Sequence, residues 1–462
     1  MPTNSSCGVH VKNKKWYRRL LERIDHSYND HILVLDQGNL LEDVELLREL
    51  ERSFVVCFYG GEIKLRALLK QNKDRRVIII KRDNSYFPHD IEECVEIIVF
   101  SKKDIEKPTS NVFPDRYYDL AHLEERVEDL LKKGTISWLE LAPLWGELAY
   151  KSQKGKSSRK ILTFEDTIQT KFTTFILEQY SDLFFRGYLI NPVTVDRVMP
   201  FLSHQEVGKK ALICFDGMGF QEWYCLKEFL GNMGINNFRE TSVFALLPSL
   251  TSISRCSLLT GEKCFERFTT ETKGFPKFIR EHWPNGERKT IELFIKANPM
   301  TLMPVYFEYE YVGIIFNLID KIAHATQGVL DNKLIMLNNL RQILPETEIP
   351  QIIVRFLEED YRVFITSDHG SVWCEGIGLK PSKYMVEEKA KRVALFPNKI
   401  LAREFLEKDE KLIEFEHKDT LGNSIAVFPP GHKMYGKTDH RAISHGGIHM
   451  EEVIIPFVEI IQ

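Results

Sequence analysis

Aspartate and histidine side chains gather in short polar clusters along the second half of the chain. The clustered residues are Asp216, Asp320, His324, Asp368, His369 and His445. Carboxylate and imidazole groups are ligands that zinc, manganese and iron accept. Two such metals about 4 Å apart can hold both the attacking and the leaving oxygen of a phosphoryl displacement. The clusters therefore predict a metal site for phosphoryl-transfer chemistry.

Among the hydroxyl groups, Thr251 is the best-placed nucleophile. It precedes an apolar-periodic run, so we expect it at the N-terminal end of a helix that ends near residue 260. Free backbone N–H groups and the helix dipole favour both an alkoxide and a bound phosphate there. A threonine hydroxyl is a weak nucleophile at its free pKa, and direct metal coordination is one way to activate it. Ser252 and Ser254 are competing hydroxyls, and Ser252 is the stronger rival.

The elements that must position these residues are strands of near-continuous apolar sequence. We expect strands at 211–215, 312–318, 362–366 and 453–460. The first three run directly into polar clusters, and ligands bind beyond the carboxyl ends of strands in open parallel sheets. Asp320 and His324 are four residues apart, so both side chains can face the same way on a helical turn. The second half of the chain therefore predicts an α/β domain with a doubly wound sheet.

Each cluster also has a simpler interpretation. Asp216 with its glycines is also typical of a strand-to-helix turn, and Asp368 with His369 is also typical of a turn. Asp320 and His324 also suit a solvated pair one helical turn apart. All the candidates follow strand-like runs, and this joint pattern favours the metal site.

Three further residues are candidate substrate contacts. Arg255 either touches the phosphate or pairs with a carboxylate. The polar run 432–440 offers Lys437 and His440, which suit phosphates or bases, and a polar surface loop is the alternative. His449 has no predicted partner and is interpreted as an ordinary histidine.

The first part of the chain has a different organisation. Strands are expected at 31–35, 54–59, 76–81 and 96–100, with helices at 14–24, 40–51 and 62–71. This alternation favours a small parallel sheet covered on both faces. Residues 115–203 are expected to be mostly helical, with helices at 120–133, 138–150 and 166–185. Residues 151–160 are expected to form a basic solvated loop, and a phosphate-contacting patch is the alternative. The predicted domains are a small α/β domain at 1–110, a helical domain at 111–204 and a catalytic α/β domain at 205–462.

Composition narrows the class of protein. The chain has 462 residues, of which 43% are hydrophobic, so disorder is excluded as its main state. The net charge of −4 excludes a protein that coats nucleic acid through a surface that is basic all round. A local basic groove is compatible with this net charge. The eight cysteines form no CxxC pair, so neither a disulfide framework nor a cysteine zinc site is indicated. The polar start and the lack of a long apolar run predict a soluble, cytoplasmic protein without a signal peptide or membrane span.

The order of these clusters resembles that of the alkaline phosphatase superfamily. The segments FDGMG, LPSLTSISR and SHGG followed by EEVIIPF are similar to PglZ domains, over roughly residues 205–462. The resemblance implies two divalent metals, usually zinc, with manganese or magnesium as alternatives. One metal would be held by Asp216, Thr251, Asp368 and His369, and the other by Asp320, His324 and His445. Thr251 would attack phosphorus in line and form a covalent phosphothreonine.

The resemblance also implies a function. PglZ proteins belong to BREX phage-defence systems, so we expect a metal-dependent phosphodiesterase that acts on nucleotides or oligonucleotides and works with other defence proteins. A sulfatase is excluded, because no cysteine stands at Thr251 and Ile253 replaces the proline of that motif. Two alternatives stay open: a phosphomonoesterase or phosphotransferase, and an assembly subunit that binds partner proteins or DNA with little catalysis. Residues 1–110 resemble a receiver domain poorly and are expected to dock a partner protein.

Overall fold

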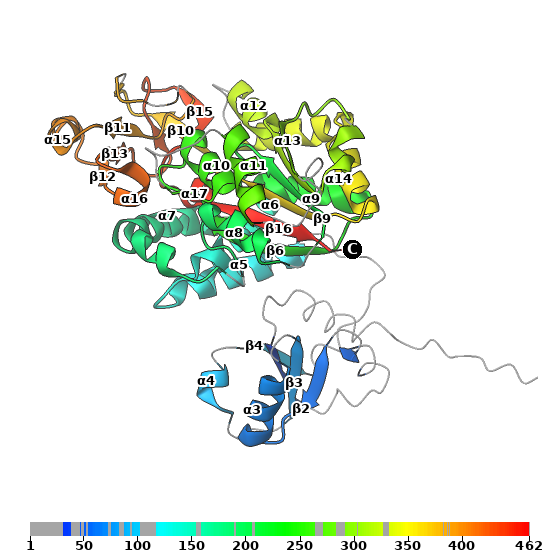
Figure 1. Cartoon of the computed structure of the whole chain (residues 1–462). Helices are drawn as coiled ribbons and strands as arrows, with labels where there is room; N and C mark the ends of the chain where they lie inside the picture. Colours follow the sequence, from blue (N-terminus) through cyan, green and yellow to red (C-terminus); the bar gives the residue numbers. More distant parts are fainter. Residues whose placement is uncertain are drawn as a thin grey trace, which may run out of the picture. The chain divides into compact units, whose positions relative to one another are not determined.

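The computed structural model comprises two compact units, Met1–Phe113 and Pro114–Gln462. Each unit is described separately below (Figure 1). The described residues are 31–37, 47, 50–51, 54–72, 75–82, 87–92, 95–101, 117–153, 159–188, 191–205, 208–263, 271–282, 292–302, 304–326, 332–381, 383–385, 387 and 389–461. The predicted helix at 14–24 and most of the one at 40–51 lie outside them.

The first unit contains a parallel sheet with the strand order β2-β3-β1-β4. Its strands are β1 (His31–Gln37), β2 (Val55–Phe58), β3 (Val77–Lys81) and β4 (Glu96–Ser101), with the helices α3 (Glu62–Gln71) and α4 (His89–Glu92). Every residue of β3 is buried, as expected for an apolar strand between two neighbours. The four predicted strands and the predicted helix at 62–71 are confirmed.

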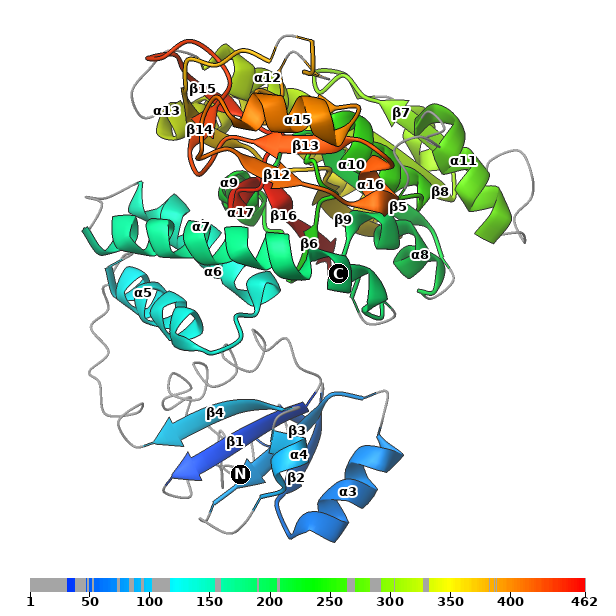
Figure 2. The same cartoon turned by 90° about the vertical axis from the view of Figure 1, so that its left-hand side faces the viewer.

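The second unit begins with a layer of helices. These are α5 (Tyr117–Lys132), α6 (Trp138–Ser152), α7 (Arg159–Gln179) and α8 (Val198–Ser203), with 3₁₀ turns at Tyr180–Phe185 and Val195–Arg197. Helices α5, α6 and α7 lie side by side (Figures 1 and 2). The helical predictions are confirmed, but residues 151–152 and 159–160 extend α6 and α7, so the expected loop at 151–160 was too long.

Aromatic rings join this layer to the main sheet. The Trp138 ring on α6 lies 5.0 Å from that of Phe172 on α7. The Phe172 ring in turn stacks at 6.5 Å on Phe244, the last residue of β6 (Phe238–Phe244). The helices and the sheet therefore share one hydrophobic core.

The main sheet of the second unit has the order β6-β16-β9-β5-β8-β7. The additional strands are β5 (Lys210–Phe215), β7 (Glu292–Lys296), β8 (Tyr311–Phe316), β9 (Arg362–Ser367) and β16 (Ile454–Ile460). Strands β7, β8, β5 and β9 are parallel, whereas β16 runs antiparallel to β9 and β6. The four strands predicted here are confirmed, and β6 and β7 were not predicted.

Helices follow the strands of this sheet, which makes the fold mixed α/β, as predicted. They are α9 (Phe220–Asn232), α10 (Thr251–Thr260), α11 (Glu271–His282), α12 (Leu318–Ala325), α13 (Asn332–Ile343), α14 (Ile349–Glu358) and α17 (Met450–Val453). Every residue of β5, β8 and β16 is buried. No helix in the described ranges is long and apolar enough to cross a membrane.

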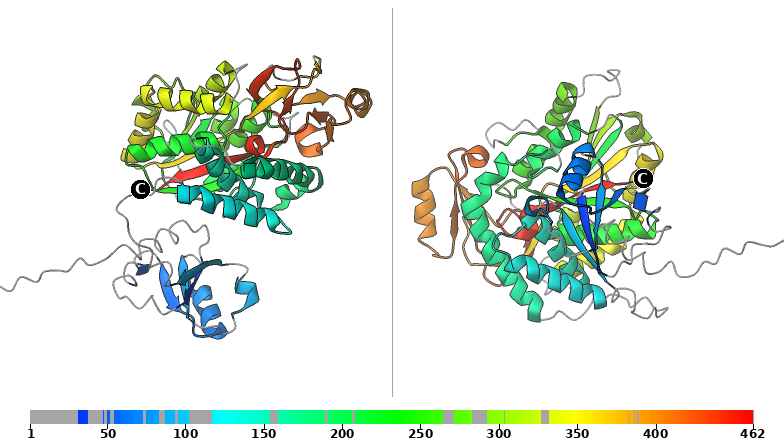
Figure 3. Two further views of the ribbon diagram at one scale, coloured as in Figure 1. Left: turned by 180° about the vertical axis from the view of Figure 1, so that it is seen from behind. Right: turned by 90° about the horizontal axis from the view of Figure 1, so that it is seen from below.

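Two small sheets complete the unit. One has the order β14-β10-β15, from β10 (Val372–Gly376), β14 (Lys433–Met434) and β15 (Arg441–Ser444). The other has the order β11-β13-β12 and lies at the margin of the unit with α15 and α16 (Figure 3). Its elements are β11 (Ala394–Phe396), β12 (Ile413–Phe415), β13 (Ile425–Phe428), α15 (Lys399–Leu406) and α16 (Lys418–Leu421).

Candidate metal centre and nucleophile

The polar clusters meet at one edge of the main sheet. Asp216 directly follows β5 and Asp368 directly follows β9, and these two strands are parallel neighbours. Asp320 lies in the first turn of α12, which begins two residues after β8, the other parallel neighbour of β5. Because the carboxyl ends of parallel strands lie at the same edge, side chains distant in sequence converge there.

The first ligand group consists of Asp216, Asp368 and His369, whose ligand atoms lie within 4.8 Å of one another. His369 Nε2 is 3.8 Å from both Asp216 Oδ1 and Asp368 Oδ2. Within the described part of the chain, these two carboxylate oxygens are buried and have no hydrogen-bond partner. Arg255 supplies one positive charge, with its Nη1 2.7 Å from Asp216 Oδ2 and 3.5 Å from Asp368 Oδ2. Two buried carboxylates beside one arginine are costly unless a further cation compensates them. The donor set therefore fits a divalent metal.

The second ligand group consists of Asp320, His324 and His445, also within 4.8 Å of one another. Asp320 Oδ1 is 2.8 Å from His324 Nε2, one helical turn away. Burial opposes ionisation of Asp320, but the hydrogen bond and charge of His324 lower its pKa overall. All three side chains line the same small hollow. The i,i+4 pair on α12 is thus joined by a histidine from the far end of the chain.

Backbone carbonyls orient two of the imidazoles. His369 Nδ1 donates to the carbonyl of Gly370 at 3.0 Å, and His445 Nδ1 donates to the carbonyl of Ser249 at 3.1 Å. Each ring therefore keeps Nε2 as its free electron-pair donor, the arrangement typical of metal-ligating histidines. Burial and the neighbouring His369 lower the pKa of His445, which keeps its ring neutral. The two rings stack at 4.0 Å and so connect the two ligand groups.

Thr251 is the first residue of α10, as predicted, and its hydroxyl faces the first group. Thr251 Oγ1 lies 2.9 Å from His369 Nε2. The rival hydroxyls are placed differently. Ser254 Oγ donates to the carbonyl of Asp368 and accepts from the N–H of Leu246. The Ser252 side chain is exposed to solvent. Of these three hydroxyls, only that of Thr251 lies within hydrogen-bond distance of a side chain of the ligand groups, because Ser254 reaches only the backbone of Asp368.

Arg255 pairs with the carboxylates of Asp216, in the first ligand group, and of Glu271. Its Nη1 donates to Asp216 Oδ2 at 2.7 Å, and its Nε donates to Glu271 Oε1 at 2.8 Å. Burial and the charge of Asp216 raise the pKa of Asp368, and Arg255 opposes that shift. Of the two roles considered for Arg255, the structure shows carboxylate pairing. A contact with substrate stays a prediction.

Lys437 and His440 lie in the segment between β14 and β15, beside the small sheet. His440 Nε2 is 3.3 Å from Lys391 Nζ. Among the described residues, no hydrogen bond or ion pair joins Lys437 or His440 to the two ligand groups. Their contact with substrate stays a prediction.

Ser249 is a supporting residue that the sequence did not reveal. Its Oγ donates to the carbonyl of Gly447 and accepts from the N–H of Gly446, both at 3.1 Å, and its own carbonyl binds His445. Ser249 is fully buried two residues before Thr251. It therefore ties the nucleophile segment to the loop that carries His445.

Replacing Ser249 by alanine is expected to weaken binding of divalent metal by up to about tenfold, because the hydroxyl that fixes Gly446 and Gly447 is lost while the backbone carbonyl that orients His445 stays. The change leaves a buried N–H and carbonyl without partners, which costs about 1–3 kcal/mol of folding free energy. Metal titration and urea unfolding measure the two effects. Wild-type metal affinity in this variant would show that the Ser249 hydroxyl does not position His445.

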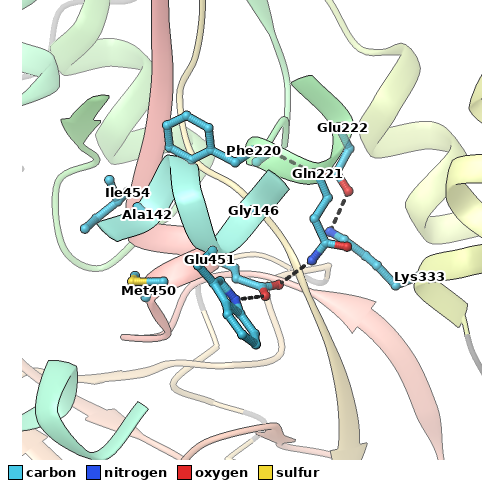
Figure 4. A pocket seen from close by; sticks show the side chains of 11 residues that line it. Ala142, Gly146, Phe220, Gln221, Glu222, Lys333, Met450, Glu451 and Ile454 are labelled. Atoms are coloured by element: carbon cyan, nitrogen blue, oxygen red, sulfur yellow. Dashed lines mark hydrogen bonds and ion pairs between the residues drawn. The ribbon is translucent and has the colours of Figure 1, made fainter. Parts of the chain in front are cut away.

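A separate small pocket lies between α6, α9 and α17 (Figure 4). Trp145 Nε1 and Gln221 Nε2 donate to the two oxygens of Glu451, at 2.8 and 3.1 Å. Burial raises the pKa of Glu451. In Figure 4 the side chain of Gln221 reaches toward Glu451 and that of Lys333 toward Glu222. The contacts of Trp145 and Gln221 with Glu451 join α6 and α9 to α17.

Beside this pocket, an ion pair supports the loop that carries Asp216. Lys333 Nζ lies 2.6 Å from Glu222 Oε1, and Glu222 Oε2 accepts the N–H of Gly219 at 2.9 Å. Glu222 is fully buried. A buried carboxylate with these two partners holds Gly219 in place three residues after Asp216.

His449 is a buried N-cap of α17. Its Nδ1 accepts the N–H of Glu451 at 3.3 Å, so its ring must be neutral in this arrangement. Burial, followed by the nearby charges of His432 and Arg392, lowers the pKa of His449 well below 6.5. As the pH falls below about 6.5, protons therefore bind the unfolded chain before the folded one.

We expect the free energy of unfolding of His449→Gln to fall less steeply than that of wild type as the pH is lowered below 6.5. Wild type should lose up to about 1.4 kcal/mol per pH unit more than this variant as the pH falls from 6.5 toward 5. Urea unfolding at pH 7.5, 6.5 and 5.5 measures the difference. Parallel pH profiles for the two proteins would contradict the prediction.

Comparison with known proteins adds a family. The family model described as "BREX system PglZ alkaline phosphatase-like domain" matches residues 194–460. Solved structures similar to this chain include murine and human ectonucleotide pyrophosphatase/phosphodiesterase 5, each at 14% identity and a TM-score of 0.39, covering 54% of this chain and 87% of theirs. An inactive form of the murine enzyme in complex with AMP gives 14% identity, a TM-score of 0.40 and coverages of 55% and 88%. No curated protein sequence matches significantly.

Proposed function

Because this chain belongs to the PglZ family of alkaline phosphatase-like domains, we propose that it is a metal-dependent phosphodiesterase with Thr251 as its nucleophile. The observation that carries the proposal is the position of Thr251 Oγ1, 2.9 Å from His369 Nε2, at the start of α10. The sequence indicated three hydroxyl groups as candidate nucleophiles. Of these, that of Thr251 alone lies both at the first position of the helix and within hydrogen-bond distance of a side chain of a ligand group.

The reaction has two displacements at phosphorus. Thr251 Oγ attacks the phosphorus, the bond to the ester oxygen breaks, and the leaving alcohol takes the threonine proton. Phosphorus is then bound to Thr251 Oγ and still carries its second ester group. Water attacks this phosphorus, the bond between Thr251 Oγ and phosphorus breaks, a proton of the water restores the hydroxyl, and a phosphomonoester leaves. The helix N-terminus favours the negative charge of the phosphoryl group in both steps.

Two divalent metals, with zinc as the first choice, would complete the site. Asp216, Thr251, Asp368 and His369 would hold one metal, and Asp320, His324 and His445 the other. When bound, they supply positive charge at the attacking and leaving oxygens. The protein contributes the imidazoles that Gly370 and Ser249 orient, and Arg255 holds Asp216 in place.

The proposed substrate is a nucleotide or an oligonucleotide, and the proposed setting is phage defence with other proteins of a BREX system. The description of the family supports the setting. A cytoplasmic location would suit that setting, and the first unit would serve as a docking domain for a partner.

Metal analysis combined with turnover tests the proposal. The purified protein should bind close to two divalent metals per chain and hydrolyse bis-p-nitrophenyl phosphate. Binding of metal without turnover of either the diester or p-nitrophenyl phosphate would favour an assembly subunit. Hydrolysis of the monoester alone would favour a phosphomonoesterase, and a protein that binds no metal would refute the enzymatic proposal.

A further inference from the structure

A carboxylate from an outer segment lies beside the proposed nucleophile. Glu387 belongs to the segment between β10 and β11, and its Oε1 accepts the backbone N–H of Ser252 at 2.9 Å. Ser252 is the second residue of α10 and directly follows Thr251. One of the free N–H groups at this helix N-terminus, which would suit a phosphate oxygen, is therefore already bound to an internal anion.

The segment around Glu387 is anchored on the other side of the site. Lys389 Nζ donates to Asp320 Oδ2 at 2.9 Å. Ser444 Oγ donates to the carbonyl of Lys389 at 3.1 Å and accepts the N–H of Lys391 at 2.9 Å. Ser444 immediately precedes His445. Glu387 is thus held between the nucleophile helix and the second ligand group.

The surroundings of Glu387 favour its charged form. Burial opposes ionisation, but the nearby His445 and the hydrogen bond from Ser252 lower the pKa of Glu387 overall. A charged carboxylate therefore stands next to the position where phosphorus must be attacked.

We propose that Glu387 is a specificity-determining residue that selects phosphodiesters over phosphomonoesters. The inference rests on the proposed phosphodiesterase function. A monoester at neutral pH carries close to two negative charges on three non-bridging oxygens, whereas a diester carries one charge on two. A monoester has a third non-bridging oxygen, for which the N–H of Ser252 would be a suitable donor. Because Glu387 already accepts this N–H, that oxygen would instead meet the negative carboxylate of Glu387. A diester avoids this contact, so the fixed negative charge penalises the monoester more.

The test compares wild type with Glu387→Gln on two substrates, p-nitrophenyl phosphate and bis-p-nitrophenyl phosphate. Glutamine keeps an acceptor for Ser252 but removes the charge. We expect kcat/KM for the monoester to rise about tenfold relative to that for the diester, mainly through a lower KM. The inhibition constant of inorganic phosphate against diester hydrolysis should fall about tenfold as well. Glu404→Gln, an exposed carboxylate on α15, is the matched control and should leave the ratio unchanged.

The other outcomes separate this inference from the function on which it rests. An unchanged ratio in Glu387→Gln, with a diester-hydrolysing wild type, overturns the inference alone. A wild type that hydrolyses no diester overturns both. Loss of bound metal in Glu387→Gln would make Glu387 a ligand, and loss of diester turnover in both Glu387→Gln and Glu387→Ala would make it part of the reaction, so either result also overturns a selective role.

Discussion

Thr251→Ala is expected to lower kcat for bis-p-nitrophenyl phosphate by about a thousandfold or more, because the covalent route needs the hydroxyl. The substitution should not unfold the chain. Thr251 is partly exposed at the first position of α10, and its hydroxyl bonds only to His369 among the contacts described. Asp216, Asp368 and His369 stay in place, so metal should still bind, although more weakly. Stopped assays with metal analysis of the same samples measure both effects.

Ser252→Ala is the matched control for the nucleophile. It removes the neighbouring hydroxyl, which is exposed, and leaves the backbone N–H that Glu387 accepts. We expect this variant to keep most of the turnover. Acid quenching of the wild type during turnover of this diester should also trap a p-nitrophenyl phosphoryl group on the peptide that contains Thr251. Full activity in Thr251→Ala, or a phosphoryl group on Ser252, would refute the assignment.

The convergence of Asp216, Asp320 and Asp368 at one edge of the sheet could be predicted because each follows a strand of near-continuous apolar sequence. The strands before Asp216 and Asp368 are buried on both faces, and such strands are recognised by their lack of alternation. The helix start at Thr251 was also visible in the sequence. The convergence of distant clusters at one sheet edge then follows from parallel pairing alone.

The edge strands could not be predicted in the same way. In β6, Phe238–Phe244, the first half is polar and partly exposed and only the last three residues are buried, so neither alternation nor an apolar run marks it. The direction of β16 was equally hidden, because composition does not encode strand direction. The chain enters β16 from the His445 side through the short helix α17, without the crossover that a parallel strand needs.

The residues that support the site were invisible for a different reason. Arginine and glutamate are mostly surface residues, so nothing in the sequence distinguishes a buried pair from a solvated one. Arg392 and Glu452 are sixty positions apart and meet only in the fold. Arg255 shows the same limit. Whether its guanidinium contacts a phosphate or a carboxylate could not be predicted without the positions of Asp216 and Glu271.

This buried pair leads to the largest stability effect that we expect. Arg392 and Glu452 are both fully buried, and Arg392 Nε donates to Glu452 Oε1 at 3.0 Å. Glu452 also accepts the N–H groups of Gly447 and His449, at 3.1 and 2.8 Å. A side chain on Gly447 would meet both members of the pair within 3 Å. The pair therefore fixes the loop that begins at His445.

Arg392→Met should lower the free energy of unfolding by about 3–5 kcal/mol, because the Glu452 carboxylate is left buried without its counter-charge. Arg403→Met, an exposed arginine on α15, is the control and should change it by no more than about 0.5 kcal/mol. Urea unfolding of the three proteins measures these values. Loss of the ion pair also removes support from the loop after His445. The folded fraction of Arg392→Met should therefore bind metal more weakly than wild type. Equal stability of Arg392→Met and Arg403→Met would mean that Glu452 is compensated by its backbone donors alone, and that the ion pair is not what holds His445 in the site.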